Sequence, residues 1–249
     1  MTGYRVYRLS ERAIVLEVEA TYCNQSETST QNKINVLAES LRDSILPDYN
    51  FDIYSRPQNT ENFTDAIISV VSGFLNLTLY LKHSNHIDYW LNELQTLWQQ
   101  MLCSRDAQHS AQHIVVPVIY GTENPSYGPD LNKLAAERGL SPKQVVDIHC
   151  QSEYPIYFLG FQPGFAYLGN LDKRLHTPRL ANPRLKIPAG SVAIGGESTG
   201  VYPNDSPGGW HIIGRTDLIL FDHNRSPSCL FRPGDSVTFK AVSAFERGV

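Results

Sequence analysis

The sequence is poor in cysteine and has no long apolar run. Its four cysteines are far apart in 249 residues and form no C-x-x-C pair, so zinc and thioredoxin-type chemistry have little support. No apolar segment approaches membrane-spanning length, and the N-terminus MTGYRVYRLSER lacks the apolar region of a secretory signal. We therefore expect a cytoplasmic protein with reduced thiols and without a membrane partner.

The sequence also lacks a strong net charge of either sign. It contains neither the common nucleotide-binding motif nor a complete metal-binding motif. A formal net charge of −4 leaves no basic footprint, so no nucleic-acid partner is expected. The sequence contains no G-x-x-x-x-G-K-[ST], which excludes a P-loop. The pairs His83 with His86 and His109 with His113 lack a third ligand, so we predict no metal site. Ser191 is outside any G-x-S-x-G elbow, which disfavours a serine hydrolase.

What is present begins with a small α/β pattern. Hydrophobic residues make up 41% of the chain and charged residues 18%, as in a globular enzyme or enzyme subunit. The first hundred residues contain strand-like alternation and helix-like apolar spacing in turn. We predict strands at 4–9, 13–19 and, around Ser72 and Gly73, at 66–82, with helices at 30–45 and 86–102. We interpret their apolar stripes as core.

A polar segment without periodicity, CSRDAQHSAQH at 103–113, predicts a domain boundary. The domains are then 1–103 and 113–243. Two short helices are expected early in the second domain, because Gly139 suits a helix C-cap and Ser141 an N-cap. Beyond residue 155, short β segments separated by glycine and proline, among them LILFD at 218–222, indicate a β-barrel or sandwich. The predicted fold class is α+β: a small α/β domain followed by a β-barrel.

Three loops of the second domain have an unusual composition. They are FLGFQPGFAYLG, TPRLANPRLKIPAGS and NDSPGGWHIIGRT. Gathered at one end of a barrel, they would form a pocket with aromatic walls and guanidinium groups, which suits a small carboxylate or phosphate. The glycines beside Pro207 permit close backbone approach of a substrate or a partner chain. Turn residues alone also explain these loops, and Trp210 equally suits a plug of the barrel end.

Several long segments in the second half of the sequence resemble a known family. VPVIYG, YGPDLNKLAAERGLSPKQVVDIHCQSEYPIYFLGFQPGFAYLGNL, TPRLANPRLKIPAGSVAIGGESTGVYPNDSPGGWHIIGRTDLILFD and RPGDSVTF resemble the family of the 5-oxoprolinase B subunit. That family includes allophanate-hydrolase-like first subunits and the sporulation-kinase inhibitor, with a carboxyltransferase subdomain. The resemblance implies a cyclophilin-like barrel. It also implies ATP-dependent opening of 5-oxoproline to glutamate together with a C-type subunit of related barrel architecture and an A-type subunit, ATP being used at the level of the complex.

The pocket and the resemblance together predict site residues. As catalytic residues we predict His211, which relays a proton, with Arg215 or Arg184 stabilising developing charge. The predicted substrate-binding residues are Phe161, Gln162, Pro163, Gly164, Arg179, Ser191, Tyr202, Gly209 and Trp210.

Two other functions share this module. One is inhibition of a histidine kinase by protein binding, and the other is the carboxyltransferase module of a biotin-dependent, urea-carboxylase-like enzyme. One position departs from the family pattern: Ser198 occupies the place where a glutamine is expected before Thr-Gly. Serine keeps a hydroxyl but loses the amide and its reach, so the substrate or partner can differ there.

Overall fold

The computed structural model describes residues 3–19, 27–45, 66–103 and 111–243. The chain divides into two units, residues 1–109 and 110–249. Most of the polar segment that predicts the boundary, residues 104–110, lies outside the described residues. The predicted domain limits, 1–103 and 113–243, therefore stay a prediction.

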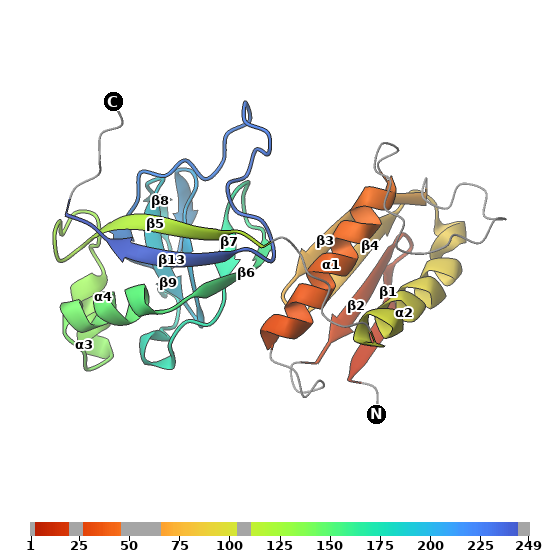
Figure 1. Cartoon of the computed structure of the whole chain (residues 1–249), viewed down its shortest axis with the longest axis horizontal. Coiled ribbons are helices and arrows are strands. Elements are labelled where there is room, and N and C mark those ends of the chain that lie inside the picture. The colour runs from red at the N-terminus through yellow and green to blue at the C-terminus, as the bar shows by residue number, and fades with distance from the viewer. Residues whose placement is uncertain (1–2, 20–26, 46–65, 104–110, 244–249) are drawn as a thin grey trace. The chain divides into compact units, whose positions relative to one another are not determined.

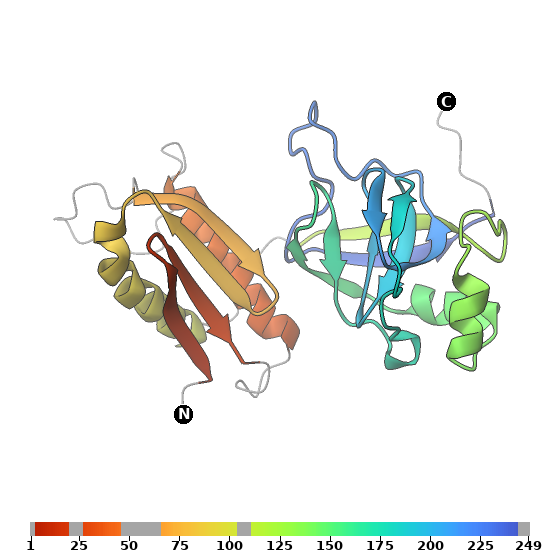
Figure 2. The ribbon, with the colours of Figure 1, turned by 180° about the vertical axis from the view of Figure 1, so that it is seen from behind.

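The first unit is an antiparallel sheet with two helices on one face (Figure 1). Its elements are β1 (Tyr4–Ser10), β2 (Ala13–Val18), α1 (Glu27–Ile45), β3 (Ile67–Gly73), β4 (Asn76–Leu81), the 3₁₀ turn η2 (Ser84–His86) and α2 (Ile87–Cys103). The strand order is β1-β2-β4-β3, with α1 over β3 and β4 and α2 over β1 and β2. Figure 2 shows the face of the sheet without helices. The helices and strands predicted for this unit are confirmed.

The packing of the first unit follows from apolar spacing on its helices. Helix α2 buries Trp90, Leu94 and Trp98 at intervals of four, which places them on one face of the helix. Helix α1 is also hydrogen-bonded to the β3–β4 hairpin. Its buried Gln31 accepts from the Leu75 N–H at 2.8 Å and donates to the Gly73 carbonyl at 3.1 Å. The β3–β4 hairpin is thereby held against α1. None of the described helices is both long and apolar enough to cross a membrane.

The second unit is a closed barrel with two short helices. Its elements are β5 (His113–Tyr120), α3 (Leu131–Glu137), α4 (Pro142–Gln151), β6 (Tyr154–Leu159), β7 (Ala166–Leu168), the 3₁₀ turn η3 (Lys173–Leu175), β8 (Arg184–Ile187), β9 (Ser191–Gly195), β10 (Ser198–Val201), β11 (Ser206–Gly208), β12 (His211–Arg215) and β13 (Ser236–Ala241). The barrel order is β10-β7-β6-β13-β5-β12-β9, while β8 and β11 pair separately. Strand β13 runs parallel to β5 and brings the end of the unit back to its beginning. The predicted fold class is confirmed.

The ends of the two short helices agree with the sequence. Gly139 has φ +65° just beyond α3, a conformation that glycine adopts without strain. The Ser141 hydroxyl accepts from the Gln144 N–H, and the Gln144 side chain accepts from the Ser141 N–H, which makes a capping box at the start of α4.

Two segments of the barrel unit differ from expectation. The predicted strand at 218–222 forms only one bridge, between Phe221 and Cys229, because its backbone bonds join a neighbouring loop through Leu230 N–H to the Leu220 carbonyl. Residues 184–187, expected to be loop, form β8 by pairing with β11. Both differences depend on partners distant in sequence, which local composition does not reveal.

We expect limited proteolysis to cleave first between Cys103 and His113. The expectation rests on sequence, because polar segments without periodicity are preferred cleavage sites between domains. Mass spectrometry of the early fragments should show two protease-resistant pieces that correspond to the two units. First cleavage within 155–240 would contradict the proposed boundary.

Candidate functional site

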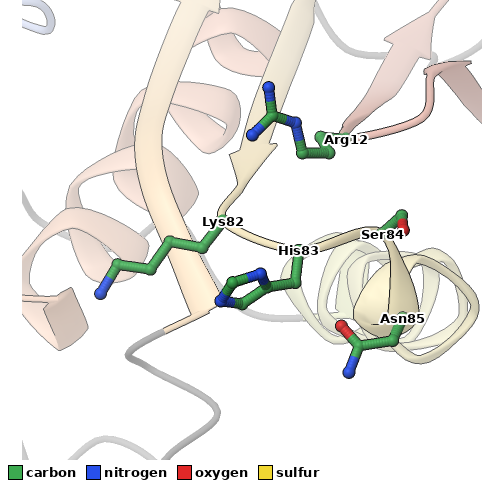
Figure 3. A pocket seen from close by; sticks show the side chains of 5 residues that line it. All are labelled: Arg12, Lys82, His83, Ser84 and Asn85. Atoms are coloured by element: carbon green, nitrogen blue, oxygen red, sulfur yellow. The ribbon is translucent and has the colours of Figure 1, made fainter.

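An open hollow of about 620 Å³ lies in the first unit (Figure 3). It is lined by Arg12, Lys82, His83, Ser84 and Asn85. All five are exposed, and in Figure 3 the Arg12 side chain projects away from those of Lys82 and His83. Its lining groups do not converge as an active site requires. The chemistry predicted from sequence lies in the barrel unit instead.

An aromatic cluster in the barrel unit comprises Phe161, Phe165, Tyr167, Tyr202 and Trp210. Phe165 is its centre, with ring centroids 5.1 Å from Tyr167, 5.4 Å from Tyr202 and 5.5 Å from Trp210, all edge to face. The indole of Trp210 is buried. Within the chain the indole packs in this cluster, and its predicted roles, at a substrate, at a partner chain or as a plug of the barrel end, stay predictions.

Glycines make room for this cluster. A Cβ at Gly195 of β9 would lie 2.5 Å from the Trp210 ring, and one at Gly208 of β11 would lie 2.4 Å from the Tyr202 hydroxyl. The turn predicted at Pro207–Gly209 is in part a strand, because Ser206–Gly208 form β11 by pairing with β8. Gly208 approaches Tyr202 of its own chain more closely than a residue with a Cβ could. The approach of this segment to a substrate or partner stays a prediction.

His211 begins β12 and is held by the loop that precedes β8. Its Nε2 lies 2.9 Å from the Pro178 carbonyl oxygen, and the Leu180 N–H donates to the Gly209 carbonyl at 2.7 Å. A carbonyl only accepts, so Nε2 must carry the hydrogen in this contact. In the neutral ring, Nδ1 then presents a lone pair. That nitrogen is buried and has no partner in the described chain.

Arg184 is held by an acid that sequence analysis missed. Its Nη2 donates to Asp130 Oδ1 at 2.6 Å, while Asp130 Oδ2 accepts from the Ile212 N–H at 2.7 Å. Asp130 is 5% exposed, and its own N–H donates to the Ile212 carbonyl at 3.0 Å. The carboxylate therefore fixes Arg184 beside β12, one residue from His211.

Replacing Asp130 with Ala is expected to lower the free energy of unfolding by about 3 kcal/mol. The change leaves the guanidinium of Arg184 and the Ile212 N–H without their acceptor. Asp147 provides a matched control, because its 2.6 Å pair with Lys143 is exposed and should contribute less than about 0.5 kcal/mol. Urea titration of both variants measures the difference. Equally small losses would show that Asp130 does not hold this strand.

The charges of Arg179 and Arg184 both act on the phenol of Tyr202. Burial raises the pKa of this phenol. A hydrogen bond with the backbone of Trp210 and the charges of Arg179 and Arg184 partly oppose this rise. The phenol therefore stays protonated near neutral pH and remains a donor. The Arg179 guanidinium lies 5.8 Å from the centroid of the Trp210 ring, in a cation–π arrangement.

Several buried polar atoms of the barrel unit have no hydrogen-bond partner in the described chain. Among the described residues, such side-chain atoms are Gln162 Nε2, Arg184 Nη1, Ser206 Oγ, His211 Nδ1 and the indole nitrogens of Trp90 and Trp98. Four of the six belong to the three loops selected from sequence. Because an unpaired buried polar atom costs free energy, such atoms are expected where a ligand completes the bonding.

Arg215 lies elsewhere. It ends β12, four residues after His211, so the two Cα atoms are about 13 Å apart at the usual rise of a strand. Its guanidinium stacks 5.3 Å from the centroid of the Tyr127 ring. Its charge contributes to the lowered pKa of Asp205, after the larger effects of Lys186 and the Ala189 N–H.

The structure thus separates the predicted residues into two groups. One group comprises Phe161, Tyr202, Trp210, Arg179 and Arg184, which ring contacts and charge interactions link, together with residues close to them in the chain, namely Gln162, Pro163, Gly164, Gly209 and His211. The other comprises Arg215 and Ser191, which are opposite each other in the β9–β12 register. Asp130 and Phe165 were missed: an Asp before a helix ordinarily indicates a cap, and a loop Phe ordinarily indicates core.

No metal centre is evident in the described part of the chain, where no group of three or more His, Cys, Asp or Glu side chains is placed to bind an ion. The chemistry that the first group can supply is hydrogen bonding, proton acceptance and charge stabilisation. This combination fits a small anionic ligand with an apolar part.

The chain is similar to known carboxyltransferase domains and 5-oxoprolinase B subunits. The family model described as carboxyltransferase domain, subdomain C and D, matches residues 4–231. The chain is 42% identical to the 5-oxoprolinase B subunit of Escherichia coli O157:H7 over 240 residues, 96% of each protein. It is 47% identical to the Bacillus subtilis protein of the same name over 140 residues, 56% of this chain and 57% of that protein.

Solved structures share the fold. The crystal structure of TTHA0988 has a TM-score of 0.67 and 26% identity over 95% of this chain, which spans 41% of that longer chain. The urea carboxylase of Kluyveromyces lactis has a TM-score of 0.64 over 96% of this chain and 22% of its own. At 16% identity, this second likeness concerns the fold alone.

Proposed function

We propose that the chain is the B-type subunit of an ATP-dependent 5-oxoprolinase. It belongs to the family of carboxyltransferase domains, subdomains C and D, which includes the 5-oxoprolinase B subunits. The observation that carries the proposal is 42% identity to a 5-oxoprolinase B subunit along almost the full length of both chains. The reaction converts 5-oxo-L-proline to L-glutamate at the expense of ATP. C-type and A-type subunits complete the enzyme.

The chemistry explains the need for ATP. Water attacks a lactam poorly, because attack must overcome amide resonance. Transfer of the γ-phosphoryl group of ATP to the lactam oxygen, with release of ADP, gives an activated carbon. Addition of one water there and cleavage of the ring C–N bond, with the nitrogen leaving as the protonated amine, give an acyl phosphate. A second water hydrolyses the acyl phosphate to the γ-carboxylate of glutamate and free phosphate. Negative charge on the transferring phosphoryl group calls for preorganised cations.

The first group of residues suits the substrate part of this reaction. His211 Nδ1, fixed as an acceptor by the bond from Nε2 to the Pro178 carbonyl, takes a proton from the lactam N–H or from the attacking water. Arg184, held by Asp130, stabilises the oxyanion or phosphoryl oxygens. Arg179 and Tyr202 bind the substrate carboxylate. Arg215 serves a separate anion, such as a phosphate, at the far end of β12.

The remaining parts of the reaction are assigned to partner chains. The sequence has no P-loop, so we assign ATP binding to the complex rather than to a nucleotide motif of this chain. A complex of the three chains should convert labelled 5-oxoproline to glutamate when ATP is present, which chromatography of the products would show. Labelled 5-oxoproline that stays intact in the complete mixture would overturn the proposal.

A carboxyltransferase role is the second candidate. It is favoured by the description of the family model and by 27% identity to a putative urea carboxylase of Emericella nidulans over 49% of this chain. Transfer of labelled carboxyl from carboxybiotin to urea by the same complex would favour this role. The full-length similarity to a 5-oxoprolinase chain makes it the weaker candidate.

A further inference from the structure

Phe161 combines an unusual backbone with an exposed ring. Its φ is +70°, in the left-handed region, and the residue is 61% exposed. The Gln162 N–H donates to the Gly160 carbonyl at 2.8 Å, which closes a three-residue turn around Phe161. Such turns with positive φ are rare and strained, and a bulky residue in this region is an outlier.

The rest of the β6–β7 loop is built from residues that suit it. The Phe165 N–H donates to the Gln162 carbonyl at 3.0 Å, with Pro163 and Gly164 as the central residues of the turn. Gly164 has φ +81°, the conformation that the third position of a type II turn requires. Glycine would satisfy the backbone at 161 in the same way. The backbone therefore does not explain why this position carries phenylalanine.

Packing within the chain does not explain the choice either. The Phe161 ring is edge-on to Phe165 at 5.6 Å and to Tyr202 at 6.4 Å. Most of its surface nevertheless stays in water, so burial offsets little of the backbone strain. Strained residues of this kind are concentrated at ligand clamps and active sites, where the strain places a needed side chain.

The groups around the ring indicate what it faces. Tyr202, in edge contact with Phe161, lies within range of the charges of Arg179 and Arg184. The neighbouring Gln162 has a buried Nε2 without a partner in the described chain. The Phe161 ring is thus in contact with a phenol that two cations influence, and the next residue in the chain carries a buried amide donor without a partner. This pattern is complementary to a small molecule with a carboxylate, an amide oxygen and a run of methylene groups.

We propose that Phe161 is a specificity-determining residue, whose strained turn holds its ring as the apolar wall over the methylene groups of the cyclic amide substrate. The proposal rests on the proposed function of this site. The ring contributes to ground-state and transition-state binding alike, since the methylene groups do not react. Its loss should therefore appear in KM rather than in kcat.

The test separates the ring from the turn by comparing three variants of Phe161. In the reconstituted three-chain complex, Phe161→Ala and Phe161→Gly should each raise KM for 5-oxoproline about tenfold, with kcat within about twofold of wild type. Phe161→Tyr keeps the ring and should keep KM within about twofold. In the isolated chain, Phe161→Gly should melt about 2 to 4 °C above Phe161→Ala, because glycine relieves the strain.

Asn170 provides the matched control. It is exposed and has φ +59°, so Asn170→Gly changes a second left-handed position outside the aromatic cluster and should leave KM unchanged. Wild-type KM in Phe161→Ala, or Phe161→Gly no more stable than Phe161→Ala, would overturn the proposal. So would a raised KM that an excess of the partner chains restores, since the ring would then be a contact between chains. A wild-type complex inactive on 5-oxoproline would instead defeat the proposed function, and the assignment of the ring's ligand with it.

Discussion

His211→Gln is expected to lower kcat of the reconstituted complex by about 100-fold, the usual effect of losing a positioned acid–base group. The Gln amide can still donate to the Pro178 carbonyl, which His211 Nε2 contacts at 2.9 Å. It offers no basic lone pair in place of Nδ1. The chain should therefore keep its fold, with the free energy of unfolding changed by about 1 kcal/mol. Initial rates with saturating 5-oxoproline and ATP, beside a urea titration, measure both effects.

His176 is the matched control for this experiment. Its Nε2 contacts the Leu171 carbonyl at 2.9 Å, in a loop of the same unit, so His176→Gln makes the same chemical change away from the aromatic cluster. It should leave kcat within about twofold of wild type. Equal losses in the two variants, or a wild-type rate in His211→Gln, would remove His211 from the chemistry.

Acid should destabilise the barrel through His149. This side chain is fully buried, stacks on Phe239 at 4.4 Å, and bonds Tyr120 Oη through Nδ1 at 2.7 Å and Thr199 Oγ1 through Nε2 at 2.8 Å. Thr199 donates its hydroxyl to the Ala193 carbonyl, so it accepts from Nε2, and Nδ1 is left to accept from Tyr120. The network is complete with a neutral ring. Burial lowers the pKa of His149 to about 3.

The sign of the pH dependence follows from this shift. The unfolded chain binds the His149 proton near its ordinary pKa of about 6.5, while the folded chain does not until about pH 3. Stability is thus fully present above pH 6.5 and is lost as pH falls below it, by about 1.4 kcal/mol per unit. We expect a loss of about 2 to 3 kcal/mol between pH 6.5 and 4.5 from this residue.

Urea titrations of the barrel across this pH range test the assignment. His149→Gln should be less stable at pH 7 but should lose about 2 kcal/mol less on acidification, because the titrating group is gone. A wild-type slope in His149→Gln would show that other groups control acid stability.

The parts of the fold that were predictable are those specified locally. The N-cap at Ser141 and the glycine at 139 are encoded within a few residues, and both appear as expected, while Gln144 completes a capping box that was not predicted. Strand β8 was not predicted, because it exists through pairing with β11, where Ile187 is opposite Ser206. Strand formation depends on such partners more than on local composition.

In the candidate site, too, the features specified locally were predictable and those that depend on distant residues were not. The three loops were identifiable from their own glycine, proline and arginine content, and ring contacts and charge interactions link Phe161, Arg179, Arg184, Tyr202 and Trp210. Asp130 was not identifiable, since it is 54 residues before its partner Arg184 and its position suggested only a helix start. The separation of Arg215 from His211 was within reach of the sequence, because GWHIIGR was predicted as a β segment and four residues of a strand span about 13 Å, as β12 shows.

The most direct test of the account is the dependence of ATP hydrolysis on all three chains. The purified chain is mixed with its candidate C-type and A-type subunits, and phosphate release is followed with and without 5-oxoproline, omitting each chain in turn. We expect substrate-dependent phosphate release only in the complete mixture. Full activity from this chain alone, or no substrate-dependent release from the complete mixture, would contradict its identity as the B-type subunit of a 5-oxoprolinase.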